Sequence, residues 1–166
     1  MHFELVQDLE AGLPAVEAAY LNDDFLAELG RLPKLGSPVF LDRRQEGGKV
    51  RQRVRYAFVG QLSSAVTAVV DPKRLTWVDD ALLDPATHTT TFRILPDHYA
   101  GLLQAAGTIT LAAAGTGTTR RTEGELKVRV PFVAGKVETA IISGLRDYAA
   151  VESEALDRWI ANGSSS

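Results

Sequence analysis

The feature that most constrains this 166-residue chain is a long stretch of helical hydrophobic spacing near its end. Between about residues 132 and 162, apolar or small residues recur at intervals of three and four, which predicts one amphipathic helix. The positions that form this stripe are Val137, Ile141, Leu145, Tyr148, Ala149, Ala155, Leu156, Trp159 and Ile160. A helix of roughly 28 residues is about 42 Å long. It therefore requires an apolar surface of matching length elsewhere in the chain.

The middle of the chain predicts that surface as a series of β-strands. Residues 2–9 alternate, with Phe3, Leu5 and Leu9 on one side. Gly47 and Gly48 separate two further strand-like runs, and paired glycines supply the positive φ angles of a tight hairpin turn. These runs span 38–46 and 49–59, and later strands are expected over 74–84, 88–95, about 102–114 and 118–130. Strands joined by consecutive hairpins form an antiparallel sheet.

Two short helices are expected between the first strand and the hairpins. Pro14 fits the first turn of a helix, and Asn22, followed by two aspartates, fits the N-cap of a second one. Residues 60–73 are compatible with either a strand or a short helix. The order places the chain in the α+β class, with a curved antiparallel sheet of about seven strands wrapped around the long C-terminal helix.

Composition narrows the classes of function. The chain has no cysteine, which excludes disulfides, thiolate metal sites and thiol nucleophiles. A net charge of −3 argues against a nucleic-acid partner. The acidic start and the lack of an apolar run of about 18 residues argue against export and membrane insertion, so we expect a cytoplasmic location. The length fits one domain, residues 1–162, followed by a flexible tail at 163–166.

No metal or cofactor site is predicted from the sequence. His88 and His98 lack a third ligand at metal-site spacing. The Ser63–Ser64 pair lacks the glycines of a nucleophile elbow. The glycines at 115–117 join two strands rather than a strand and a helix, so they predict a hairpin turn and not a phosphate-binding loop. The oligomeric state stays open.

The strand-to-helix junction KVRVPFVAGKVETAIISGLRDYAAVESEALDRW, together with the LTWVDD and RYAFVGQL segments, resembles the helix-grip superfamily of START-like and pollen-allergen-like (SRPBCC) domains. Within it, the chain most resembles an uncharacterised group of small actinobacterial proteins. The resemblance implies a cavity between sheet and long helix. Members of the superfamily bind sterols, lipids, polyketides or plant hormones there, and some cyclise or dehydrate polyketides. The fold alone does not fix the function.

Polar residues on otherwise apolar faces are the candidate site residues. Burial raises the pKa of an unpaired carboxyl, so Asp79 and Glu152 are candidates to orient a ligand or to exchange protons. Alternatively, each turns toward solvent or pairs with an arginine such as Arg43. The predicted ligand-binding set is Tyr56, Trp77, Asp79, His88, Phe92, Leu126, Val128, Ile141, Leu145, Tyr148 and Glu152, with no residue assigned as catalytic.

Three functions remain open at this point. The leading hypothesis is a non-enzymatic carrier or sensor of a small hydrophobic molecule, lipid-like or polyketide-like. The second is an enzyme of the polyketide cyclase or dehydratase type that uses Asp79, Glu152 or Tyr56. The third is an interaction module whose helix packs without leaving a cavity. On that helix, Trp159 is expected to face the sheet, and Asp157 and Arg158 to lie on the opposite arc.

Overall fold

The computed structural model describes residues 1–36, 38–59 and 61–163, so the predicted tail, apart from Gly163, lies outside the described residues. In chain order the elements are β1 (His2–Leu9), α1 (Leu13–Tyr20), α2 (Asp23–Leu29), β2 (Lys34–Leu35), β3 (Val39–Glu46), β4 (Lys49–Val59), α3 (Ser64–Thr67), the 3₁₀ helix η1 (Pro72–Arg74), β5 (Thr76–Asp84), β6 (Thr89–Pro96), β7 (Leu103–Ala114), β8 (Gly117–Val128) and α4 (Ala134–Ala161).

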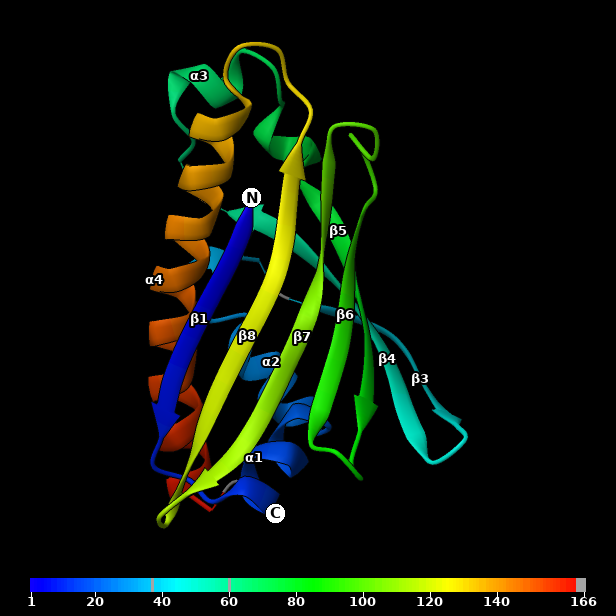
Figure 1. Cartoon of the computed structure of the whole chain (residues 1–166), viewed down its shortest axis with the longest axis vertical. Helices are drawn as coiled ribbons and strands as arrows, with labels where there is room; N and C mark the ends of the chain where they lie inside the picture. The colour runs from blue at the N-terminus through cyan, green and yellow to red at the C-terminus, as the bar shows by residue number, and fades with distance from the viewer. Residues whose placement is uncertain (37, 60, 164–166) are drawn as a thin grey trace.

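The strands form one antiparallel sheet that curves around α4. Their order is β1-β8-β7-β6-β5-β4-β2, and β3 also pairs with β4. Helix α4 lies along β1 and β8 at one side of the sheet, whereas β3 and β4 lie at the other side (Figure 1). Helices α1 and α2 lie near the C-terminal end of α4. This arrangement confirms the predicted α+β fold with a long C-terminal helix and two short helices after the first strand.

Local sequence signals account for most of the turns. The Asn22 side chain accepts a hydrogen bond of 2.9 Å from the backbone N–H of Asp24, which confirms the predicted N-cap of α2. Gly47 and Gly48 have φ angles of 58° and 81° in the turn between β3 and β4. Both angles lie in the left-handed region that glycine adopts without steric penalty.

Three local expectations need correction or completion. The sequence pattern predicts His88 inside a strand, but it lies in the turn before β6 with φ 55°, and its carbonyl accepts from the N–H of Leu111. The last strand ends at Val128 rather than at residue 130. The ambiguous stretch from residue 60 to 73 contains the four-residue helix α3, followed by η1. Proline and turn-forming residues limit each of these segments more strongly than their hydrophobic pattern does.

Two glycines allow the inner face of the sheet to accept two aromatic rings. Gly124 and Gly107 are cross-strand partners, Phe3 is opposite Gly124, and Phe92 is opposite Gly107. A Cβ atom on Gly124 would lie 2.7 Å from the Phe3 ring, and one on Gly107 would lie 2.8 Å from the Phe92 ring. Each ring therefore lies directly over a glycine, where any side chain would displace it.

The C-terminal half of α4 closes one end of the fold. Leu156 is fully buried, and the ring centroids of Trp159 and Phe25 of α2 are 5.4 Å apart. Trp159 thus packs inward, with its ring against Phe25 of α2, on a cluster that also includes Leu9 of β1 and Val54 of β4. Asp157, expected on the outward arc of the helix, does make structural contacts. Its carboxylate accepts hydrogen bonds of 2.9 and 3.0 Å from the backbone N–H groups of Glu10 and Ala11.

Candidate functional site

The inward-facing side of α4 contains one conspicuously exposed residue. Leu145 lies one turn from Ile141 and Ile142 on one side and from Tyr148 and Ala149 on the other. Ile142 and Ala149 are buried, and Ile141 and Tyr148 are half-buried. Leu145 lies at the centre of the arc that these four residues define, yet its side chain is 38% exposed. The middle of the inward face of α4 therefore borders open space rather than packed side chains.

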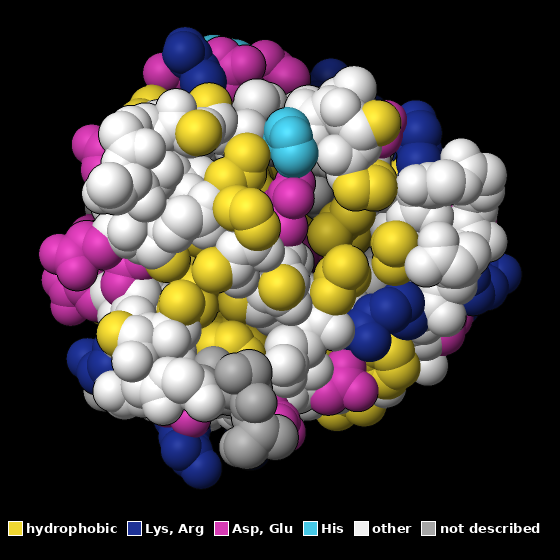
Figure 2. All heavy atoms as spheres, turned by 90° about the horizontal axis from the view of Figure 1, so that it is seen from below, with side chains coloured by type: hydrophobic (Ala, Val, Ile, Leu, Met, Phe, Trp, Pro, Cys, Tyr) yellow, Lys and Arg dark blue, Asp and Glu magenta, His cyan; other side chains and the backbone are white. Residues whose placement is uncertain are grey.

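The position of α4 explains this space. The helix packs against β1 and β8, and near its C-terminal end against α1 and α2. Strands β4, β5 and β6 diverge from it across the curve of the sheet (Figure 1). At the lower end of the molecule, where α1 and α2 lie, hydrophobic side chains are packed between polar groups and most charged side chains lie at the rim (Figure 2). That end is filled by the cluster around Phe25 and Leu156.

Asp79 of β5 is the most unusual polar group on the inner face. Its Oδ1 atom is buried and, among the described residues, has no hydrogen-bond partner. Burial, together with the nearby charges of Asp80 and Glu152, raises the pKa of the Asp79 carboxyl to about 7. A buried oxygen without a partner is unfavourable by about 1–3 kcal/mol. Such a group is a candidate for contact with a ligand.

Aromatic side chains lie next to Asp79. Tyr56 and Trp77 are cross-strand partners on β4 and β5, with stacked rings whose centroids are 6.2 Å apart. Burial, followed by the charge of Asp79, raises the pKa of Tyr56 above its ordinary value. Burial and the charge of Glu152 do the same for the pKa of Tyr148 on α4. The structure thus places Tyr56, Trp77, Asp79, Tyr148 and Glu152 in one region.

Glu152 is paired, but with a residue that the sequence analysis missed. Its Oε2 atom lies 2.9 Å from Nη1 of Arg120 on β8, and Arg120 is only 4% exposed. The expected alternative partner, Arg43, instead donates to the Gln52 side chain and pairs with Asp23. The sequence contains one indication of this role. Alternation along β8 places Arg120 on the same face as Leu126 and Val128, so it is a charged residue on an otherwise apolar face.

The remaining donors of Arg120 are also satisfied. It donates to the Gln7 side chain at 3.1 Å, to Ser153 Oγ at 3.1 Å and to the hydroxyl of Tyr20. Tyr20 in turn donates to Glu152 Oε1 at 3.3 Å, and burial raises the pKa of its phenol. We call Arg120, Glu152, Tyr20, Gln7 and Ser153 the Arg120 network. It joins β1, β8, α1 and α4 through side-chain hydrogen bonds and one ion pair.

Several predicted wall residues are placed in packed regions. Leu126 is 2% exposed and packs with Phe3 and Ile142, while Val128 is 7% exposed and packs with Val137. Both therefore support the wall from behind. Phe92 and Ile141 are half-buried and border the Leu126 cluster.

His88 lies apart from Asp79 in a turn. Its ring Nδ1 is 2.6 Å from Oε1 of Glu17 on α1. The structure therefore places this predicted site residue at the α1 end of the fold. There its side chain joins a turn of the sheet to a helix.

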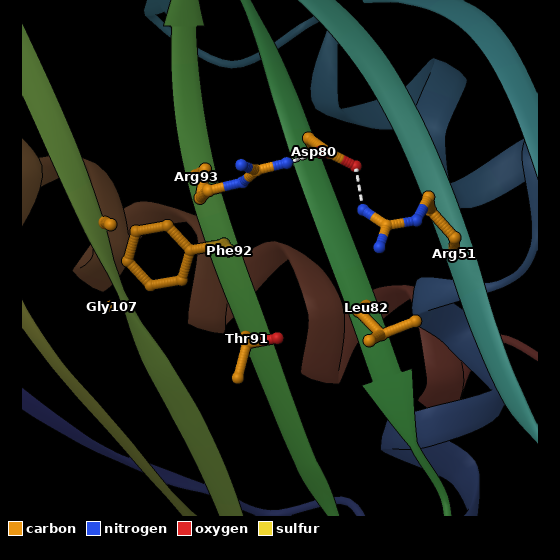
Figure 3. A pocket seen from close by; sticks show the side chains of 8 residues that line it. Arg51, Asp80, Leu82, Thr91, Phe92, Arg93 and Gly107 are labelled. Carbon is orange, nitrogen blue, oxygen red and sulfur yellow. Dashed lines mark hydrogen bonds and ion pairs between the residues drawn. The ribbon is translucent and has the colours of Figure 1, made fainter.

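The outer face of the sheet carries arginines that are neutralised by aspartates. Asp80 is 5% exposed and accepts from Arg51 at 2.8 Å and from Arg93 at 2.9 Å. Figure 3 shows these three side chains beside Phe92 and Leu82 at a surface pocket of about 300 Å³. Arg53 pairs with Asp42 and Arg55 pairs with Asp97 in the same way. The arginine row is thus balanced by acids, consistent with a solvated strand face.

Two further observations concern the described residues. No group of three or more His, Asp or Glu side chains in the described ranges has the arrangement of a metal site. None of the helices in that part of the chain is long and apolar enough to cross a membrane.

Known structures share this fold at low sequence identity. A protein from Thermus thermophilus, TTHA0849, superposes with a TM-score of 0.71 at 13% identity, covering 99% of this chain and 100% of that one. The Zhui aromatase/cyclase from Streptomyces sp. R1128 gives 0.68 at 18% identity, covering 96% and 95%. Norcoclaurine synthase from Thalictrum flavum, in complex with dopamine and hydroxybenzaldehyde, gives 0.62 at 16% identity, covering 100% and 89%. These similarities establish a helix-grip fold.

Sequence comparison adds one family. None of the curated proteins matches this sequence significantly. A family model described as a protein of unknown function, DUF2505, matches residues 4–160.

Proposed function

The chain belongs to the DUF2505 family of proteins of unknown function, and we propose that it binds a small, mainly apolar molecule in the space between α4 and the sheet. The observation that carries this proposal is the exposure of Leu145 at the centre of the inward arc of α4. In a helix that packs on a solid core, the centre of the buried arc is the least exposed position. Here it is more exposed than its four neighbours, which favours a cavity over a solid-core interaction module.

The chemistry around this space defines the class of ligand. Trp77, Tyr56 and Tyr148 provide aromatic surface, and Asp79 provides one unsatisfied oxygen. Apolar walls with a few polar groups are typical of small-molecule sites. An Asp79 carboxyl with a pKa of about 7 can donate a hydrogen bond below neutral pH and accept one above it. The ligand is therefore apolar, with one hydroxyl or carbonyl group placed at Asp79.

Binding of an environment-sensitive hydrophobic dye tests the proposal. The wild-type protein should bind about one equivalent of dye and release it when a fatty acid or an aromatic polyketide is added. Leu145→Trp fills the space with a larger side chain and should weaken dye binding by at least about tenfold, or 1.4 kcal/mol. Ala150→Trp, on the exposed arc of α4, is the matched control and should bind normally. Equal binding by both variants, or wild-type binding no greater than that of a compact control protein, would contradict a cavity at Leu145.

A second function is favoured by one specific observation. A carboxyl whose pKa lies near 7 can take up and release a proton at neutral pH, as general acid–base catalysis requires. In a dehydration, Asp79 as carboxylate would remove the proton next to a carbonyl, and the β-hydroxyl would leave as water after it is protonated. The proton that Asp79 takes up would pass to this β-hydroxyl, so the carboxylate is regenerated and the protons balance. Tyr56, whose raised pKa keeps its phenol neutral, would only donate a hydrogen bond.

The carrier and the enzyme are distinguished by Asp79→Asn. If Asp79 only lines the wall, this substitution should keep dye affinity within about tenfold, and incubation with a β-hydroxy ketone should yield no product from either protein. Product formation by the wild type that is lost in Asp79→Asn, with unchanged dye binding, would establish the enzyme instead.

A further inference from the structure

The hydrogen-bonded seam between β6 and β7 ends before either strand does. Its pairs run from Thr89 and Thr110 to Ile94 and Ala105. Beyond that point β6 stays paired with β5 as far as Pro96, and β7 stays paired with β8 down to Leu103. Two residue pairs that would continue the seam, Leu95 with Gln104 and Pro96 with Leu103, are therefore missing next to the loop of residues 97–102 that joins the two strands.

The sequence itself prevents the missing rung from forming. The N–H of Asp97 donates to Thr76 of β5 at 3.0 Å, so odd-numbered residues of β6 direct their backbone groups toward β5 and even-numbered ones toward β7. Pro96 would thus have to donate toward β7, but proline has no N–H group. The N–H of its would-be partner, Leu103, donates instead to the carbonyl of Tyr99 at 3.1 Å. Tyr99, in the loop between the two strands, adopts a positive φ of 62°.

A pocket of about 840 Å³ lies at this interruption. Its lining includes residues that point to opposite faces of the sheet: Leu95, Gln104 and Lys127 belong to the outer face, and Leu103 and Val128 to the inner face. Leu95 is 41% exposed at the outer side. The pocket is thus lined by residues that belong to both faces of the sheet.

The inner side of the opening leads to the proposed ligand space. Leu103 and Ile141 of α4 both pack against the buried clusters that contain Leu126 and Val128, and Ile141 lies one turn before Leu145. Glu138, one turn further toward the start of α4, also lines the pocket. We propose that the interrupted β6–β7 seam is the entrance through which the ligand reaches the space beside Leu145. This inference rests on the proposed function, since an entrance requires a space that is filled from outside.

Cross-linking the seam tests the entrance directly, because the chain has no cysteine of its own. Leu95→Cys with Gln104→Cys places two thiols on the pair at the mouth of the opening. Thr91→Cys with Thr108→Cys is the matched control, because this pair lies four residues along β6 and is already paired in the intact part of the same seam. Each double variant is closed by disulfide formation or by a short bifunctional thiol reagent, and closure is verified by intact mass.

The readout is the association and dissociation rate of the hydrophobic dye in stopped flow. Closing the Leu95/Gln104 pair should slow both rates by at least about tenfold and leave the equilibrium affinity unchanged, because only the path is altered. The closed Thr91/Thr108 control and the unreacted variants should bind at the wild-type rate. Pro96→Val, which restores a backbone donor toward β7, should also slow association and needs no cross-link.

The outcomes separate the two proposals. Unchanged rates in the verified cross-linked protein and in Pro96→Val would overturn the entrance and leave the ligand space standing. Equal slowing in the Thr91/Thr108 control would also overturn it, since general stiffening of the sheet would then be the cause. Absence of dye binding in every form, wild type included, would overturn the ligand space and the entrance with it.

Discussion

Arg120 Nη1 lies 2.9 Å from Glu152 Oε2, and this buried contact joins the first third of β8 to α4. Both side chains lie between the packed end around Phe25 and the open space beside Leu145. The pair fixes the distance between sheet and helix next to that space. It therefore positions the wall of the proposed site without requiring contact with the ligand.

The first prediction concerns the two partners of this pair. Arg120→Met leaves the Glu152 carboxylate buried without its cation and should lower the free energy of unfolding by about 3–5 kcal/mol. Replacing both residues, Arg120→Met with Glu152→Met, should recover a large part of that loss, because no uncompensated charge remains. Chemical denaturation of Arg120→Met, Glu152→Met and the double variant measures the coupling free energy between the two residues. Additive effects would show that the two residues do not act as a pair.

The second prediction is the pH dependence of stability that arises from Asp79. Its pKa rises from 3.8 in the unfolded chain to about 7 in the fold, so the folded state binds this proton more tightly. The contribution of this proton to the free energy of unfolding is fully present below about pH 4. It is lost as the pH rises to about 7, a decrease of roughly 4 kcal/mol at about 1.4 kcal/mol per pH unit.

Asp79→Asn removes this titration. The variant should therefore gain stability relative to wild type between pH 5 and 8, with little difference at pH 4, as measured by thermal or urea unfolding across that range. A difference between the two proteins that does not change with pH would mean that the Asp79 carboxyl is not desolvated in the fold.

The third prediction concerns the glycine beneath Phe3. A Cβ at Gly124 would meet the Phe3 ring at 2.7 Å and the Ala106 carbonyl oxygen at 2.8 Å. Gly124→Ala should therefore destabilise the fold by about 1–3 kcal/mol through overpacking. Gly144→Ala is the matched control, because a Cβ there meets nothing within 4 Å and the position is helical. It should stabilise the protein by about 0.5–1 kcal/mol. In urea unfolding, the midpoint should fall for Gly124→Ala and rise for Gly144→Ala. A change of the opposite sign in either variant would contradict the prediction.

The fourth prediction compares neighbours at the end of α4. Trp159→Ala removes the ring that packs on Phe25 and should cost about 3–5 kcal/mol. Asp157→Ala leaves the N–H groups of Glu10 and Ala11 without their acceptor, so it should cost about 1–3 kcal/mol. Arg158→Ala, which is exposed, should change stability by less than about 0.5 kcal/mol. Equal losses at all three positions in urea unfolding would contradict this order.

The sequence alone determined the elements and their faces. The stripe from Val137 to Ile160 predicted α4, the alternation around Phe3 and Leu5 predicted β1, and Asn22 and Gly47 marked a helix start and a hairpin turn. These features could be predicted because hydrogen-bonding geometry and side-chain periodicity act within a few residues. The same patterns indicated that Tyr56, Trp77, Asp79 and Glu152 share the interior.

The tertiary structure decided which of these side chains meet and which are left without a partner. Glu152 pairs with Arg120, 32 positions away, and not with Arg43, because the curvature of the sheet brings β8 rather than β3 under α4. The same curvature separates α4 from β4 to β6, so Leu145 faces open space although its spacing is that of a core residue. The strand expected over 88–95 stops just before Pro96, but only the register of β5, β6 and β7 shows that the missing N–H of Pro96 faces β7. A one-dimensional pattern specifies the face of an element, whereas the distance between facing elements depends on how the whole sheet twists and bends.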